Sequence, residues 1–336
     1  MGSVRASLLP PDSPAWRDLL GAVEHDFYHR PDYVELCARQ EGATARALLV
    51  ERGRERLLLP LLVRDDLDAL SPYGYPGPVG DRGFVADGLR AGLELLRSEG
   101  LIAAFVRLHP ILNPDPPSDV GRLVQHGQTV SIDLSLPAEE LWRQTRADHR
   151  NQINRALRNG HRAWFDEAWE HYPAFQRLYL ATMARVDASA YYRFDATYFE
   201  ELRATLGSSI HLCVVDIDGG IAAAGLFVET NGLVEFHLSG TDDAYLRQRP
   251  SKLMLHAARA WAKERGYARL HLGGGLGGAE DSLFDFKAGF SHARHAFYTL
   301  RMVADAHRYA DEVRERRPGA DPSDLGGFFP VYRAPD

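Results

Sequence analysis

The most informative stretch of the sequence is RLHLGGGLGGAEDSLFDFKAGF, residues 269–290. It begins in a segment typical of a short strand, 268–272, and continues into a loop in which five of the six positions 273–278 are glycine. Glycine allows positive φ angles and close backbone approach, and successive free N–H groups can hold anionic oxygens. The stretch therefore predicts either a shaped anion-binding loop or a flexible surface loop.

The residues after the glycine loop predict a helix that carries a lysine among aromatic side chains. Asp281 or Ser282 is suited to cap its first turn. Three phenylalanines can anchor the segment in a core, namely Phe284, Phe286 and Phe290. Lys287 lies among them, and a buried ammonium group is costly unless something pairs with it. Lys287 therefore either stabilises the oxyanion of a tetrahedral intermediate or extends its charged end to solvent.

The composition of the chain is that of a globular protein. Its 336 residues correspond to about two domains. The net charge of −7 argues against a protein that coats nucleic acid. Two cysteines, Cys37 and Cys213, exclude a disulfide framework and disfavour a cysteine metal site. The proline-containing N-terminus is unlike a secretory signal, and no long apolar run occurs, so we expect a cytoplasmic protein without membrane insertion.

Hydrophobic patterning predicts two successive α/β domains. In the first, strands are expected at 45–51, 56–63, 101–108 and 130–136, and helices at 15–24, 32–41 and 85–99. In the second, helices are expected at 138–159, 166–186, 195–206 and 251–265, and strands at 210–216, 220–229, 232–239, 268–272 and 296–304. Both halves follow the element order of the acetyltransferase fold. We place the domains at 1–137, completed by the tail 313–336, and at 138–312.

At this point the sequence resembles a known family. The segment with the motif DSLFDFKAGF is similar to the corresponding part of the Fem family, the aminoacyl-tRNA-dependent peptidyl transferases that add amino acids to cell-wall precursors. Other segments resemble the family in order and spacing: HRPDYVELCARQ (29–40), SPYGYPGPV (71–79), LWRQTRADHRNQINRALRNG (141–160), YYRFDATYFEEL (191–202) and the run 236–267. The resemblance implies two tandem GNAT-like (acetyltransferase-like) domains with mixed, largely antiparallel sheets flanked by helices.

The resemblance also implies roles for particular residues. Phe286 and Lys287 correspond to the catalytic pair at the aminoacyl ester, where Lys287 steadies the oxyanion. Arg193 corresponds to an arginine that holds acceptor phosphate, and His109 lies at or near a substrate-binding aspartate of the compact members. The segment around Tyr73 and Tyr75 resembles a substrate loop; these two, with Tyr191 and Tyr192, either shape a peptide pocket or are ordinary packing residues.

Two departures from the family concern the acceptor. The compact cell-wall members carry a lysine in the early helix that holds a nucleotide diphosphate, whereas this chain has Glu35 in the segment 33–37, and a carboxylate repels a diphosphate. The coiled-coil arm of the larger members has no counterpart. Both departures favour a small peptide acceptor, such as an antibiotic intermediate.

The identity of the donor depends on the turn 246–252, LRQRPSK. Acetyltransferases hold the CoA pyrophosphate on a glycine-rich loop at a helix N-terminus, but this turn has no glycine, and Pro250 lacks an N–H group. Its basic residues, Arg247, Arg249 and Lys252, could instead attract the phosphates of RNA or form a solvated turn.

A basic stripe on the predicted helix 138–159 supports the same interpretation. Arg150 is one of several arginines spaced to lie near one face. Such a stripe either follows a phosphate backbone or pairs with carboxylates elsewhere. The histidines show no metal-site spacing, so we predict no metal and no cofactor.

These observations lead to one predicted function and two alternatives. We expect an aminoacyltransferase that uses aminoacyl-tRNA as co-substrate and forms an amide bond on a small amine-bearing acceptor, with no DNA partner. The acceptor amine is expected to lose its proton to the substrate or to His109. The alternatives are an acyl-CoA-dependent N-acyltransferase of the GNAT superfamily and a non-catalytic binding module that keeps only the fold.

Overall fold

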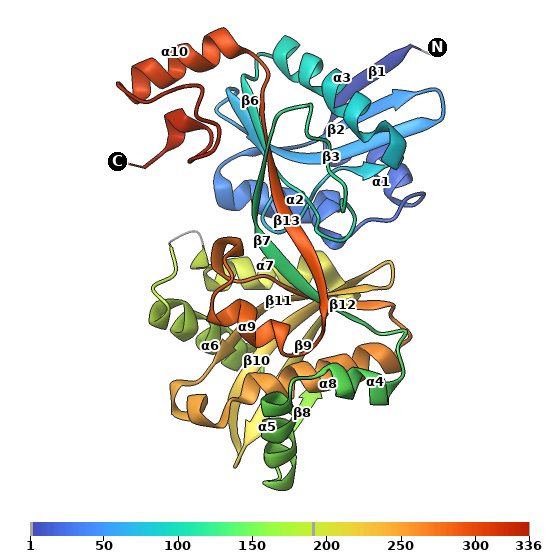
Figure 1. Ribbon diagram of the computed structural model, residues 1–336, viewed down its shortest axis with the longest axis vertical. Helices are drawn as coiled ribbons and strands as arrows, with labels where there is room; N and C mark the ends of the chain where they lie inside the picture. Colours follow the sequence, from blue (N-terminus) through green and yellow to red (C-terminus); the bar gives the residue numbers. More distant parts are fainter. Residues whose placement is uncertain (1–2, 190–191, 336) are drawn as a thin grey trace. The chain divides into compact units, whose positions relative to one another are not determined.

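The computed structural model describes residues 3–189 and 192–335, and its chain forms two compact units. The first unit comprises residues 1–127 and 296–336, and the second unit comprises residues 128–295. Each unit is a mixed, largely antiparallel sheet flanked by helices (Figure 1). This architecture confirms the predicted α/β class with two acetyltransferase-like domains.

The sheet of the first unit is built around a hairpin. Strands β1 (Val4–Leu9), β2 (Thr44–Arg52), β3 (Glu55–Arg64) and β4 (Asp68–Leu70) pair in antiparallel order, and β5 (Val79–Gly80) pairs with β3. β4 pairs in parallel with β6 (Ala103–Arg107), which pairs antiparallel with β13 (Ala293–Val303). Every residue from Leu57 to Val63 of β3 is buried, which explains its nearly continuous apolar sequence.

The helices of the first unit cover this sheet. α2 (Pro31–Glu41) and α3 (Val85–Ser98) pack on β2 and β3, and α1 (Pro14–Leu20) precedes them. α10 (Ala306–Arg316) and the turn η7 (Val331–Arg333) pack with Ile102 and Ala103 in a separate small core. The C-terminal tail therefore completes the first unit, and it begins earlier in the chain than the predicted residue 313.

The second unit has a meander followed by a parallel pair. β8 (Arg162–Phe165), β9 (Ile210–Ile217), β10 (Gly220–Thr230) and β11 (Leu233–Thr241) are antiparallel. β11 pairs in parallel with β12 (Arg269–Gly273), which pairs antiparallel with β7 (Arg122–Asp133). α8 (Pro250–Glu264) connects β11 to β12 and packs on the sheet with α5 (Ala147–Arg158), while α6 (Tyr172–Arg185) contacts β10 and β11 and α7 (Ala196–Leu206) follows it.

The units are bounded at 127/128 and 295/296, whereas the sequence analysis placed its boundaries at 137/138 and 312/313. The reason lies in strand pairing. Residues 130–133 of β7 pair with β12, and residues 299–303 of β13 pair with β6. Each of these strands therefore takes its place in a sheet by hydrogen bonds to a partner far away in the sequence.

The predicted helix 138–159 is wrong in one respect, because it is broken into α4 (Ala138–Gln144) and α5. Thr145 and Arg146 between them have extended backbone. Arg259 of α8 donates to the carbonyl of Leu141 at 3.0 Å and to the hydroxyl of Thr145 at 2.8 Å. These contacts satisfy the end of α4 and allow the chain to turn before α5 begins.

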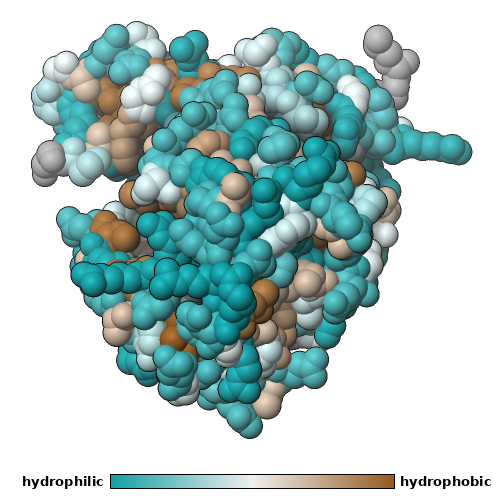
Figure 2. Space-filling view, turned by 60° about the horizontal axis from the view of Figure 1, so that its bottom comes forward, coloured by the Kyte–Doolittle hydropathy of each residue, from teal (hydrophilic) through white to brown (hydrophobic). Residues whose placement is uncertain are grey.

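Figure 2 shows a face on which hydrophilic side chains predominate and apolar side chains form small separate patches. Within the described residues, no helix combines the length and the apolar character that a membrane span requires.

Candidate functional site

The candidate site of the second unit begins where two parallel strands separate. β11 and β12 pair from Leu233/Arg269 to Glu235/His271, and beyond that rung β11 continues to Thr241 without pairing to β12. The glycine-rich loop follows β12 directly. At Gly275 an added Cβ would lie 2.1 Å from the carbonyl oxygen of Ala279, so only glycine fits this close approach.

The loop leads into the short helix α9 (Ser282–Ala288). Asp281 caps it by accepting the N–H of Phe284 at 2.9 Å, and its other oxygen accepts the N–H of Leu276 in the loop at 2.9 Å. One carboxylate therefore ties the glycine loop to the start of the helix. The predicted cap at Asp281 is present.

Lys287 is buried at the point where the strands separate. Its Nζ donates to the carbonyl oxygen of Gly274 at 2.6 Å and lies 5.9 Å from the ring centre of Phe236 on β11, with the residue 8% exposed. Among the described residues no carboxylate lies within ion-pair distance of it. Burial lowers the pKa of Lys287 to about 8, although the charges of Asp281 and Glu235 oppose this shift.

Phe286 lies half-buried beside this lysine. Its ring centre is 5.9 Å from that of His149 and 5.8 Å from that of Phe290, and its carbonyl oxygen is 2.9 Å from Nε2 of His149. The side chain is thus held by aromatic packing, and its predicted role in positioning the acceptor stays a prediction.

Sequence reasoning missed a buried polar group on the last rung before the strands separate. Nδ1 of His271 lies 2.7 and 2.8 Å from the two carboxylate oxygens of Glu235, and Nε2 lies 2.8 Å from the hydroxyl of Thr129. His271 and Glu235 are 0% and 1% exposed. A buried ionisable pair is costly to form. The signal available in the sequence was a polar residue between apolar neighbours in each strand, Glu235 between Val234 and Phe236 and His271 between Leu270 and Leu272.

Two other predicted substrate residues lie between α6 and α7. Arg193 is half-exposed; its Nε donates to the carbonyl of Ala188 at 3.1 Å, and its guanidinium lies 3.5 Å from Asp187. The carbonyl of Tyr192 accepts from Tyr179 at 2.8 Å. Tyr191 lies outside the described residues. Arg193 therefore belongs to the second unit, as does Lys287.

The remaining predicted substrate residues, His109, Tyr73 and Tyr75, belong to the first unit. Nδ1 of His109 accepts the N–H groups of Ile111 and Leu112 at 3.1 Å, and Nε2 lies 3.2 Å from Asp26. Both ring nitrogens of this fully buried histidine are engaged, which does not favour the expected role as a base. The carbonyl of Tyr73 accepts from Tyr33, and the ring of Tyr75 packs edge-on against Phe297.

The predicted RNA-binding residues separate into two groups. Arg150 donates to the carbonyls of Thr145 and Arg143, and Lys252 is buried in an ion pair with Asp148 at 2.9 Å, so both are used internally. Arg247 and Arg249 are exposed in and directly after the turn η5 (Asp243–Gln248) that precedes α8.

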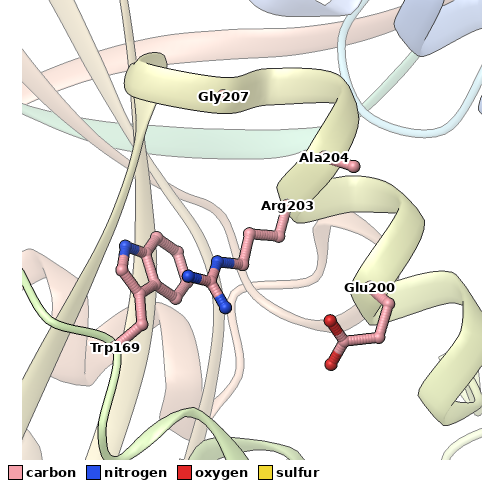
Figure 3. A pocket seen from close by; sticks show the side chains of 5 residues that line it. All are labelled: Trp169, Glu200, Arg203, Ala204 and Gly207. Atoms are coloured by element: carbon pink, nitrogen blue, oxygen red, sulfur yellow. The ribbon is translucent and has the colours of Figure 1, made fainter.

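A surface hollow lies elsewhere on the second unit. Its lining residues are Trp169, Glu200, Arg203, Ala204 and Gly207 (Figure 3). The guanidinium of Arg203 lies 4.4 Å from the ring centre of Trp169. None of the predicted site residues lines this hollow.

A family model matches the part of the second unit that contains the candidate site. Residues 143–287 match the family model of the acetyltransferase (GNAT) domain, and the matched range ends at Lys287. No curated protein matches the sequence. The second unit therefore contains an acetyltransferase-like domain, which supports an acyltransferase.

Solved structures share the fold over most of the chain. The structure of FemX has a TM-score of 0.58 and 13% identity, with 78% of this chain and 90% of that chain covered. The C-terminal domain of a candidate lysylphosphatidylglycerol synthetase from Agrobacterium fabrum has a TM-score of 0.58 and 17% identity, with 89% and 95% covered. L-PGS from Bacillus licheniformis has a TM-score of 0.52 and 14% identity, with 88% and 93% covered. At these identities the similarity establishes the fold.

Proposed function

We propose that the protein is an aminoacyl-tRNA-dependent aminoacyltransferase that adds an amino acid to the amine of a small peptide or peptide-like acceptor. The acceptor belongs to antibiotic biosynthesis or to cell-wall precursor modification. Aminoacyl-tRNA is the co-substrate, and the reaction takes place in the cytoplasm without a further cofactor. The ester donor is already activated, so the enzyme must orient two reactants and stabilise an oxyanion.

The observation that carries this proposal is the placement of Lys287. Its ammonium group lies at the end of β12, beside a glycine loop whose backbone can approach a substrate closely. A fixed cation in a site that excludes water stabilises developing negative charge far more than it would in bulk solvent. The amine attacks the ester carbonyl, the tetrahedral oxyanion faces Lys287, and the tRNA 3′-terminal hydroxyl leaves with a proton.

The choice of donor is supported by the start of α8. Arg249 has a left-handed backbone (φ 53°) and Pro250 occupies the first helical position, so this turn lacks the glycine backbone donors that hold a pyrophosphate. Arg247 and Arg249 are exposed there and offer positive charge to a phosphate backbone.

The choice of acceptor is supported by the early helix of the first unit. Glu35 is exposed on α2, where a carboxylate disfavours a nucleotide diphosphate. A short peptide remains compatible with the tyrosine-rich segment around Tyr73 and Tyr75. We assign Phe286, Arg193, His109 and Tyr192 to the acceptor as well.

The test is a transfer assay with two donors in parallel. Total tRNA charged with radiolabelled amino acids is incubated with a panel of small-peptide acceptors, and acetyl-CoA is supplied in a matched reaction. We expect label in the acceptor only from charged tRNA, and we expect RNase treatment to abolish it. The double variant Arg247→Ala/Arg249→Ala should raise KM for charged tRNA and leave KM for the peptide acceptor unchanged.

The same assay decides between the alternatives. Acceptor labelled only from acetyl-CoA would establish an acyl-CoA-dependent N-acyltransferase, a function that is also compatible with the match to the acetyltransferase family model. Peptide binding without transfer from either donor, unchanged in Lys287→Ala, would indicate a binding module.

A further inference from the structure

The helix that carries Lys287 has little support of its own. α9 has seven residues, and isolated helices of this length are unstable in water. Its first turn is capped by Asp281, but that contact ties it only to the glycine loop. The position of the lysine therefore depends on what holds the second half of the helix.

The start of α5 holds that half through Arg146. The guanidinium forms a bidentate ion pair with Asp285 of α9, at 2.7 and 3.0 Å, and its backbone N–H donates to the carbonyl of Gly289 at 2.8 Å. These contacts lie on either side of Lys287 in the sequence. Planar bidentate pairs fix geometry as well as distance.

His149, one turn further along α5, makes the third contact. Its Nε2 lies 2.9 Å from the carbonyl oxygen of Phe286, and its ring lies 5.0 Å from that of Phe290. The packing is tight, because a Cβ added at Gly289 would lie 2.4 Å from this nitrogen. His149 thus contacts the residue directly before Lys287.

Both residues are themselves fixed by one carboxylate. Asp148 lies 2.8 Å from Nε of Arg146, 3.0 Å from Nδ1 of His149 and 2.9 Å from Nζ of Lys252 on α8. Although partial burial opposes ionisation, hydrogen bonds from Lys252, Arg146 and His149 lower the pKa of Asp148. The network therefore connects α8, α5 and α9.

We propose that Arg146 and His149 are positioning residues of the transfer reaction, which hold α9 so that Nζ of Lys287 stays at the carbonyl oxygen of Gly274. This inference rests on the proposed function for the role of the lysine. For Arg146, which belongs to the basic stripe of the predicted helix 138–159, it corresponds to the second of the two interpretations, pairing with carboxylates.

Two variants and a matched control test it. Asp285→Asn removes the charge that Arg146 binds, and His149→Ala removes the contact to Phe286. Asp311→Asn on α10 removes an exposed aspartate that pairs with Arg314 and serves as the control. We expect kcat to fall about 10- to 100-fold in both test variants, with KM changed less than about twofold, since a displacement near 1 Å costs this much. The control should match the wild type.

A second readout needs no substrate. The chain has three lysines, so acetic anhydride labelling followed by peptide mass spectrometry reports each one separately, with Lys263 as internal reference. In Asp285→Asn and His149→Ala we expect a higher midpoint in the pH dependence of Lys287 labelling, and faster labelling above pH 10.5, where the amine is mostly neutral in every variant. His149→Gln, whose amide can donate near the same position, should restore the wild-type behaviour.

The two readouts separate the two proposals. Wild-type labelling of Lys287 and wild-type kcat in both test variants would overturn the positioning role. Altered labelling in a protein that transfers nothing from charged tRNA would support the positioning of Lys287 and reject the donor assignment. Asp285→Asn changes only an exposed side chain, so this variant keeps the test decisive if His149→Ala does not fold.

Discussion

The ammonium group of Lys287 donates a 2.6 Å hydrogen bond to the carbonyl oxygen of Gly274, thirteen residues earlier in the chain. This contact places a buried cation at the point where β11 and β12 separate. A backbone carbonyl neutralises none of the lysine charge, so the charge remains available to a substrate oxyanion.

Removing this cation should abolish most of the activity. We expect Lys287→Ala to lower kcat at least about 100-fold, by analogy with the loss of one oxyanion donor. Lys287→Arg keeps the charge but changes its shape, so an intermediate loss is expected. Steady-state kinetics with the charged-tRNA donor check both, and an unchanged kcat in Lys287→Ala would refute the role.

The activity should fall as the pH rises through about 8, because the pKa of Lys287 is lowered to about 8 by burial and the neutral amine cannot stabilise an oxyanion. The pH profile of kcat measures this decrease, the falling limb of the profile at high pH. In Lys287→Arg the limb should be absent, since a guanidinium stays charged throughout this range. A falling limb that persists unchanged in that variant would assign it to another group.

The same shift predicts how stability depends on pH. Between about 8 and the ordinary value of 10.5, the unfolded chain binds the Lys287 proton and the folded chain does not. The free energy of unfolding of the wild type should therefore rise with pH across this window relative to Lys287→Met. Urea unfolding at pH 7.5 and 10 measures the free energy of unfolding of both proteins. The same change with pH in both would contradict a lowered pKa for the buried Lys287.

The buried Glu235–His271 pair should be sensitive to the loss of one partner. We expect Glu235→Leu to destabilise the protein by about 3–5 kcal/mol, because it leaves a buried imidazole without its carboxylate. The double variant Glu235→Leu/His271→Leu should recover much of this loss, since neither ionisable partner of the pair is then left buried without the other. Chemical denaturation measures both, and equal losses in single and double variants would argue against a coupled pair.

The glycine loop offers a contrast between two neighbouring positions. Gly275→Ala places a Cβ 2.1 Å from the carbonyl of Ala279, so it should displace the loop and greatly reduce activity. Gly277 has φ 61° and open space around it, and asparagine tolerates that conformation. Gly277→Asn should therefore stay close to the wild type in melting temperature and kcat. Wild-type melting temperature and kcat in both variants would show that the loop shape is unimportant.

Local signals in the sequence were sufficient for most elements. Alternating and helical patterns located β2, β3, α2, α3, α8 and β9 to β12 within a few residues, because each has a clear apolar period. The cap at Asp281 was also predictable, since capping depends on residues within one turn. The short strand β1 and the helix α10 were missed.

The two α/β halves, the glycine loop and the lysine-bearing helix were predictable, because they follow from the periodicity and chemistry of neighbouring residues. The three-dimensional fold was needed to show that β7 and β13 pair with strands far away in the sequence, that α4 and α5 are separate helices, and that Glu235 contacts His271. The contacts of Arg146 and His149 with α9 also depend on the fold. These contacts join residues separated by tens of positions or more, and no local pattern encodes which distant partner satisfies a buried charge or a free strand edge.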